Sequence, residues 1–239
     1  EWSINPAVVA HWQRGKQNAS GHVPHMPSMM DFPIHIALRN ALVQPEGWET
    51  GWMGLYEMLA NDFVYPDPDA LVVFAENHDT PRLLAHVDGN LSRWQLGMAY
   101  LATVRGTPQF YYGSEVLLRG PKERDDGQLR ADMPGGWVGD LANAFSGNGL
   151  GDAQQSAQRY IRALFNWRKR TPVLHDGALT HFAPVDGVYV YVRHRGGAAV
   201  MVMLNKHDAP RTVALERFDA CLSYTSDAAD GLECGDLRR

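Results

Sequence analysis

The chain has 239 residues and a formal net charge of −5, from 22 basic and 27 acidic residues. This length supports one large domain or two smaller ones, and the mildly acidic charge gives no reason to expect nucleic acid or an anionic membrane as a partner. No apolar run is long enough to span a bilayer, and both cysteines lie in the last twenty residues, so neither a disulfide framework nor a Cys-based metal site is expected.

The first part of the chain predicts helices separated by loops. A helix should begin at Pro6 and end before Gly15, since proline suits a first turn and glycine a C-terminus. A short buried strand is expected at 28–32, stopped by a proline. Two further helices are expected at 34–42 and 52–59, where apolar residues recur at helical spacing.

The run at 70–74 is short, apolar and rich in β-branched residues, which predicts a strand buried on both faces, as in a parallel sheet. Polar and charged residues follow at once: Glu76, Asn77, His78, Asp79 and Arg82. Such a cluster predicts a site at the C-terminal edge of a parallel α/β sheet. The alternative is an ordinary polar loop in which Asp79, Thr80 and Pro81 open a helix.

A helix at 92–104 and a strand at 109–112 come next, and with the strand at 70–74 they give the rhythm of a parallel βαβ unit. Residues 117–151 show no convincing element. A loop of this length in a compact domain is usually functional or mobile. A last strong helix is predicted at 154–170, with apolar residues on one face.

The character of the sequence changes after residue 172. Alternating segments at 188–192 and 199–204, with turn residues at 186–187 and 196–197, predict antiparallel hairpins. We therefore expect one domain over 1–172 and a second over 173–220. The polar segment 221–239 differs again, and we interpret it as a non-native tail, with a genuine disordered tail as the alternative.

Four segments carry a family resemblance: Met30–Pro33, Phe74–Asp79, Gly106–Glu115 and Arg130–Trp137. Together they resemble the α-amylase superfamily, glycoside hydrolase family 13. The first three are similar to its motifs at strands 6, 7 and 8, the last of them in the form Gly-x-Pro-x-x-Tyr-Tyr-Gly-x-Glu. The fourth is similar to a loop of the cyclomaltodextrinase and neopullulanase-like members.

This resemblance implies an α/β fold, namely the last third of a (β/α)8 TIM barrel (strands 6–8) followed by the start of an antiparallel β-sandwich domain. The chain would then be a C-terminal fragment. In the family the general acid lies in a Gly-Glu-x-Trp motif after strand 5. If Trp2 is the tryptophan of that motif, Glu1 lies beside the acid, whereas a direct Glu-Trp alignment would make Glu1 the acid. The strand-4 nucleophile is expected to be absent under either alignment.

Retaining glycoside hydrolysis needs two carboxyl groups about 5 Å apart, and its transition state resembles an oxocarbenium ion. The resemblance makes Asp79 a third, catalytic carboxylate that accepts hydrogen bonds from two hydroxyls of the reacting sugar. It makes His78 a catalytic donor to the same ring, and Asn77 and Arg82 substrate-binding residues. Arg82 could orient Asp79, contact substrate, or be a solvated residue at a helix start.

Structural roles are expected for Asp31, Tyr112 and Glu115. Sugar stacking is one reading of Trp2, Trp12 and Trp137, and packing is the favoured one.

The implied activity is retaining cleavage of α-1,4-glucosidic bonds in starch-type oligosaccharides or cyclodextrins, with an α-glucan oligosaccharide as partner. An α-glucan transglycosylase and a non-catalytic sugar-binding relative are the alternatives. No cofactor and no metal site are expected, because the family's calcium sites lie mostly in parts that this chain would lack. The fragment alone is expected to be inactive.

Overall fold

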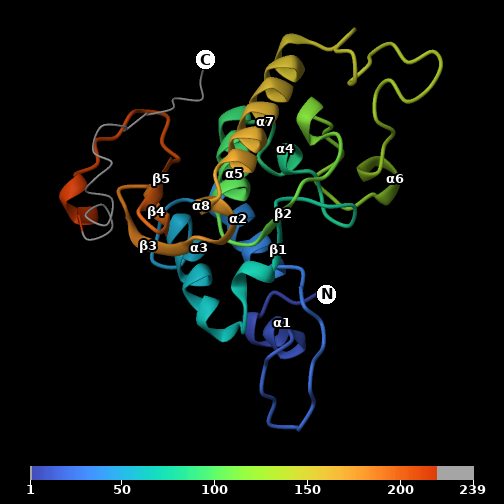
Figure 1. Ribbon diagram of the computed structural model, residues 1–239. Coiled ribbons are helices and arrows are strands. Elements are labelled where there is room, and N and C mark those ends of the chain that lie inside the picture. The colour runs from blue at the N-terminus through green and yellow to red at the C-terminus, as the bar shows by residue number, and fades with distance from the viewer. Residues whose placement is uncertain (1, 220–239) are drawn as a thin grey trace.

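The computed structural model describes residues 2–219, which contain a parallel strand pair and a three-stranded antiparallel sheet. The parallel pair consists of β1 (Val72–Phe74) and β2 (Thr107–Gln109). The antiparallel sheet consists of β3 (Ala178–Val185), β4 (Val188–Arg195) and β5 (Ala198–Asn205), in that order. Figure 1 shows this sheet on one side of the molecule. The long segment 117–151, called the excursion below, lies on the opposite side. Glu1 and the expected tail at 221–239 lie outside the described residues.

The helices precede, separate and follow these strands. The α-helices are α1 (Pro6–Trp12), α2 (Phe32–Val43), α3 (Trp52–Leu59), α4 (Leu83–His86), α5 (Leu91–Thr103), α6 (Asp126–Leu129), α7 (Asp152–Arg170) and α8 (Val173–Asp176). Short 3-10 turns lie at Ala60–Val64, Pro68–Ala70, Ser114–Val116 and Leu215–Phe218. The helix predicted at 52–59 is confirmed at both ends, and α7 extends the predicted 154–170 by two residues. None of the helices within residues 2–219 is long and apolar enough to cross a membrane.

The parallel βαβ prediction is confirmed, but its second strand lies earlier than expected. Val72 pairs with Thr107 and Phe74 with Gln109, whereas the sequence predicted a strand at 109–112. Gly106 sets this register: its φ is +91°, and a Cβ there would meet the carbonyl oxygen of Leu71 at 2.7 Å. The backbone of β2 can therefore approach β1 closely just before Thr107, whose N–H donates to that same carbonyl at 2.8 Å.

The strand predicted at 28–32 is reduced to a single parallel bridge between Met30 and Val72. The helix that follows begins at Phe32 rather than Ile34. The cause is Asp31, whose carboxylate accepts the backbone N–H of Ile34 at 3.0 Å and caps the first turn of α2. The backbone N–H of Asp31 still donates to the carbonyl of Val72 at 2.9 Å, and the pairing ends there because α2 begins at the next residue.

One core joins the helices to the antiparallel sheet. Trp52 of α3 lies 6.1 Å from Tyr189 of β4 between ring centroids, and Tyr100 of α5 lies 5.9 Å from Tyr191. All four side chains are buried, and Thr103 at the end of α5 hydrogen-bonds the hydroxyl of Tyr191. The sheet is thus packed against α3 and α5. The domain boundary expected near residue 172 falls between α7 and α8 and stays a prediction.

Candidate functional site

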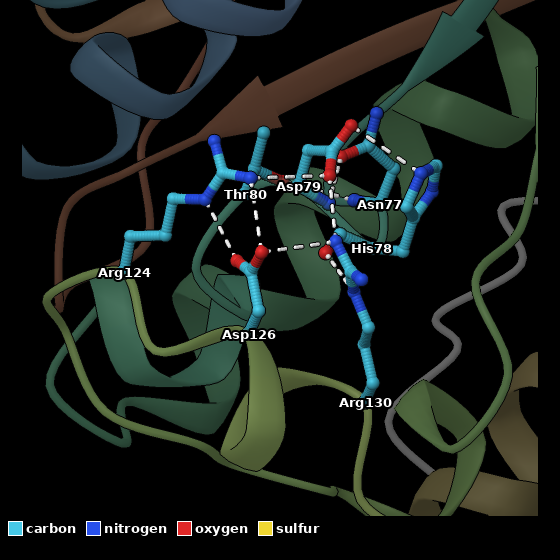
Figure 2. Close-up of polar contacts among 7 residues, drawn as sticks. All are labelled: Asn77, His78, Asp79, Thr80, Arg124, Asp126 and Arg130. Carbon is cyan, nitrogen blue, oxygen red and sulfur yellow. Dashed lines mark hydrogen bonds and ion pairs between the residues drawn. The ribbon is translucent and has the colours of Figure 1, made fainter.

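The chain turns sharply where β1 ends, and the turn is built by two polar side chains. The side-chain oxygen of Asn77 accepts the backbone N–H of Asp79 at 2.9 Å, and the Thr80 hydroxyl accepts the N–H of Asn77 at 2.9 Å. Both Asn77 and Thr80 are buried, so the turn is held from inside. It places His78 and Asp79 just past the C-terminal end of β1 (Figure 2).

His78 and Asp79 face each other across this turn. Nε2 of His78 lies 3.3 Å from Oδ2 of Asp79, and the two side chains are 58% and 21% exposed. The imidazole is therefore open to solvent, while the carboxylate is partly covered. The sequence predicted that these two residues would be presented side by side at a strand end, and the structure places them there.

The cover over Asp79 comes from the 117–151 excursion. Oδ1 of Asp79 accepts from Nη2 of Arg130 at 2.9 Å and from Nη2 of Arg124 at 3.4 Å. Asp126 lies between the two guanidinium groups, with its carboxylate 2.7 Å from Nε of Arg124 and 3.2 Å from Nη2 of Arg130 (Figure 2). The hydrogen bond from Arg124 lowers the pKa of Asp126. Two arginines and two aspartates thus form one charge-balanced cluster.

Arg82 is buried beneath the turn that carries His78 and Asp79. Its side chain is 1% exposed, so the solvated alternative is wrong. The guanidinium donates to the carboxylate of Glu76 at 3.2 Å, to the carbonyl of Tyr112 at 2.6 Å and to the carbonyl of Leu129 at 3.0 Å. It also lies 4.0 Å from the ring centroid of Tyr111. These partners belong to the strand ends and the excursion, so Arg82 joins three parts of the chain.

Direct contact of Asn77 and Arg82 with substrate stays a prediction. Within the described residues both side chains are directed at the protein: Asn77 closes the turn, and Arg82 holds Glu76 and two backbone carbonyls. Glu76 is itself buried and also accepts from the Ser114 hydroxyl and from the backbone N–H of Leu83. This buried network fixes the platform from which His78 and Asp79 project.

The structural role expected for Asp31 is confirmed, because it caps α2 and pairs with buried Arg105. The hydroxyl of Tyr112 donates to the carbonyl of Ala131 at 2.9 Å, which also ties the excursion to the strand end.

The three tryptophans considered for sugar stacking each have a partner in the protein. Trp2 stacks on Phe32 at 4.5 Å between centroids, and Trp12 lies edge-on to His11 at 4.8 Å. The indole N–H of Trp137 donates to Asp132 at 3.0 Å. All three side chains are nevertheless exposed, by 59%, 48% and 67%, so both packing and sugar stacking stay predictions for them.

Sequence reasoning missed Arg124, Asp126 and Arg130 as members of this cluster. The signal was present in the charged run 122–126 and in Arg130, which opens the loop motif 130–137. A pattern without periodicity could not show that this loop folds back onto the end of β1. Within residues 2–219, no group of three or more His, Cys, Asp or Glu side chains is arranged to hold a metal ion.

The chain is similar to known proteins both in sequence and in structure. Residues 179–234 match the model of the cyclo-malto-dextrinase C-terminal domain family. The chain is 26% identical over 208 residues to a cyclomaltodextrin glucanotransferase of Klebsiella oxytoca, covering 76% of this chain and 29% of the relative. It is 28% identical over 207 residues to the corresponding protein of Niallia circulans, covering 87% of this chain and 25% of the relative.

The structural comparison shows a likeness of fold. An α-amylase from Geobacillus thermoleovorans, solved with acarbose, matches with a TM-score of 0.64 and 23% identity over 86% of this chain and 40% of that one. The expected resemblance to the α-amylase superfamily is confirmed by these findings together. The chain spans well under half of the length of each of these proteins. The family match, which ends at residue 234, overlaps the segment 221–239 that was expected to be a non-native tail. The non-native origin of that segment stays a prediction.

Proposed function

We propose that this chain supplies the strand-end part of the active site of an α-glucan-acting enzyme that cleaves α-1,4-glucosidic bonds with retention. One observation carries the proposal. An imidazole and a carboxylate, His78 and Asp79, are presented together at the C-terminal end of a strand in a parallel pair. Catalytic groups of α/β barrels lie at this end of their strands. In this proposal β1 and β2 are the seventh and eighth strands of a (β/α)8 barrel.

The chemistry follows from the charges. As the glycosidic bond breaks, the sugar ring gains positive charge and flattens, and charge-assisted hydrogen bonds to its hydroxyls become stronger. Asp79 accepts two such hydroxyl hydrogen bonds, and His78 donates to a hydroxyl of the same ring. The nucleophile and the general acid, two further carboxyl groups, come from other strands of the enzyme. Asp79 therefore stabilises the transition state more than it binds the ground state.

Transfer to another sugar is a second candidate, because the sequence relatives are named as cyclomaltodextrin glucanotransferases. Hydrolysis and transfer share the same glycosyl intermediate and differ in the acceptor, water or a sugar hydroxyl. Product analysis with maltooligosaccharides distinguishes the two: glucose and maltose alone indicate hydrolysis, and longer or cyclic products indicate transfer.

The test is the substitution Asp79→Asn in the complete protein that contains this chain. We expect turnover of maltooligosaccharides and cyclodextrins to fall by at least about 100-fold, which is typical of a lost transition-state charge contact. Asp176→Asn is the matched control, since Asp176 is an exposed aspartate in an arginine pair far along the chain. Retention of most of the activity by the Asp79→Asn protein would refute the role proposed here.

The 239-residue chain by itself is expected to be inactive. The reaction needs two carboxyl groups in addition to Asp79. The proposed barrel also needs further strands beside the segment at 28–32 and beside β2, whose outer edges would otherwise be unpaired. Release of reducing sugar from starch or cyclodextrin by the purified chain would contradict this expectation.

A further inference from the structure

We propose that Arg130 is a positioning residue of this site, which fixes the side chain of Asp79, and that Arg82 acts one step behind it by seating the loop that carries Arg130. This inference rests on the proposed function. It assigns a role to two arginines and to the 117–151 excursion, and it explains why a buried arginine lies beneath an exposed site.

The first step concerns the hydrogen bonds that hold the loop around Arg130 in place. Arg82 donates to the carbonyl of Leu129, and Tyr112 donates through its hydroxyl to the carbonyl of Ala131. The side chain of Leu129 is fully buried. The residues on both sides of Arg130 are therefore held by the strand-end platform, and the direction of the Arg130 side chain is set by its neighbours.

The second step is the contact itself. Nε of Arg130 donates to the backbone carbonyl of His78 at 3.0 Å, while Nη2 donates to Oδ1 of Asp79 at 2.9 Å. One planar guanidinium thus spans both residues of the pair. A planar fork with fixed donors restricts a carboxylate in a way that the single ammonium of lysine does not.

The third step is how the fork is held. Asp126 lies four residues before Arg130 and accepts from its Nη2 at 3.2 Å, so the pair spans the single turn of α6. Arg124 bonds the same Asp126 at 2.7 Å and reaches Asp79 at 3.4 Å. Arg124 is therefore bound mainly to Asp126, and Arg130 is the main partner of Asp79.

The consequence is an oriented carboxylate. Arg130 and Arg124 both bind Oδ1 of Asp79, and Oδ2 faces His78. A sugar therefore meets a carboxylate whose rotation is already restricted, and this order costs nothing further in the transition state. Without Arg130 the carboxylate would rotate more freely, and the His78 carbonyl would lose its donor.

The test compares Arg130→Gln, Arg130→Lys and Arg124→Gln in the complete protein, with Arg195→Gln as the matched control. Arg195, at the end of β4, is an exposed arginine paired with Asp176 of α8, and it lies outside the cluster. For Arg130→Gln we expect kcat to fall about 10- to 100-fold with little change in KM, as expected when a reacting group is misplaced. Arg130→Lys should recover only a small part of this loss, and Arg124→Gln should have a smaller effect.

Hydrogen–deuterium exchange on the same proteins gives a readout that does not depend on activity. Arg130→Gln should raise amide exchange in segments 77–80 and 124–131 and leave the antiparallel sheet unchanged. Unchanged exchange in both segments, or a kcat equal to that of the unsubstituted protein, would overturn the proposal. If the unsubstituted protein does not act on α-glucans, or if Asp79→Asn remains active, the proposed function fails instead, and the exchange result still decides whether Arg130 fixes the turn.

Discussion

Two clusters of arginine and aspartate in this chain use the same chemistry in opposite surroundings. In one, Arg105 binds Asp31 and Asp62, and Arg105 and Asp31 are buried. In the other, Arg124 and Arg130 bind Asp79 and Asp126, and each of these side chains is at least partly exposed. The first cluster ties the start of α2 to the turn at 60–64 and the start of β2, and the second surrounds the candidate site.

The difference in burial decides what each cluster can do. Burial raises the pKa of Asp62 even though Arg105 bonds it, whereas the hydrogen bond from Arg124 lowers the pKa of Asp126. Buried charges must be matched by one another, because water cannot reach them. A partly exposed carboxylate can exchange water for a ligand hydroxyl. The buried cluster is therefore suited to stability and the exposed one to binding.

Arg105→Gln should produce the largest effect on stability. It leaves Asp31 and Asp62 without their counter-ion, and removing one partner of a buried pair typically costs about 3–5 kcal/mol. Urea unfolding followed by circular dichroism measures this loss. A change below about 1 kcal/mol would mean that burial does not distinguish the two clusters.

His35 is another buried ionisable group, and it should make the unfolding free energy depend on pH. It lies on α2 and stacks on Phe74 at 4.5 Å, and burial, followed by the nearby charge of Arg39, lowers its pKa from 6.5 to about 3. The unfolded chain binds the proton more readily than the folded chain does. The unfolding free energy therefore carries no penalty from His35 above pH 6.5, and it decreases as the pH falls toward 3. The slope should approach about 1.4 kcal/mol per pH unit for one proton.

The matched variant is His35→Phe, which keeps the aromatic stack and removes the titrating group. Its unfolding free energy should depend less steeply on pH between about 3 and 6.5 than that of the unsubstituted chain, by roughly one proton. Equal slopes for the two proteins would show that His35 does not contribute.

Asp79→Asn should separate activity from stability at the exposed cluster. The carboxylate is partly solvated, and exposed ion pairs contribute about 0–1 kcal/mol. We therefore expect the urea midpoint to stay close to that of the unsubstituted chain even if turnover in the complete protein is lost. A loss of stability as large as that of Arg105→Gln would assign Asp79 to the framework.

Arg195→Gln should have the smallest effect. Arg195 lies 2.6 Å from Asp176, which is shorter than the 2.9 Å between Arg130 and Asp79, but both Arg195 and Asp176 are more than half exposed. If solvent exposure determines how much an ion pair contributes to stability, the unfolding free energy should change by less than about 0.5 kcal/mol. A larger change would show that distance matters more than solvent in this chain.

Much of the secondary structure could be predicted, because its signals are local. Helix α3 and the two turns of the antiparallel sheet follow from apolar spacing and from Asp186-Gly187 and Gly196-Gly197. The errors occur where one contact, either a local cap or a close approach of distant backbone, overrides the pattern of apolar residues. Asp31 caps α2 and ends the expected strand, and the approach of Gly106 to Leu71 moves β2 toward the N-terminus.

The sequence by itself determined that an imidazole and a carboxylate follow a buried strand, because apolar runs and the residues that interrupt them are read from neighbours along the chain. Only the tertiary structure decided which charges meet Asp79. Arg130 lies 51 residues away from it and contacts it at 2.9 Å, and Arg82, three residues away, is turned into the interior. The physical reason is that side chains can pair only where the backbone brings them together. The backbone position of the excursion is fixed by contacts between segments that are distant in the sequence.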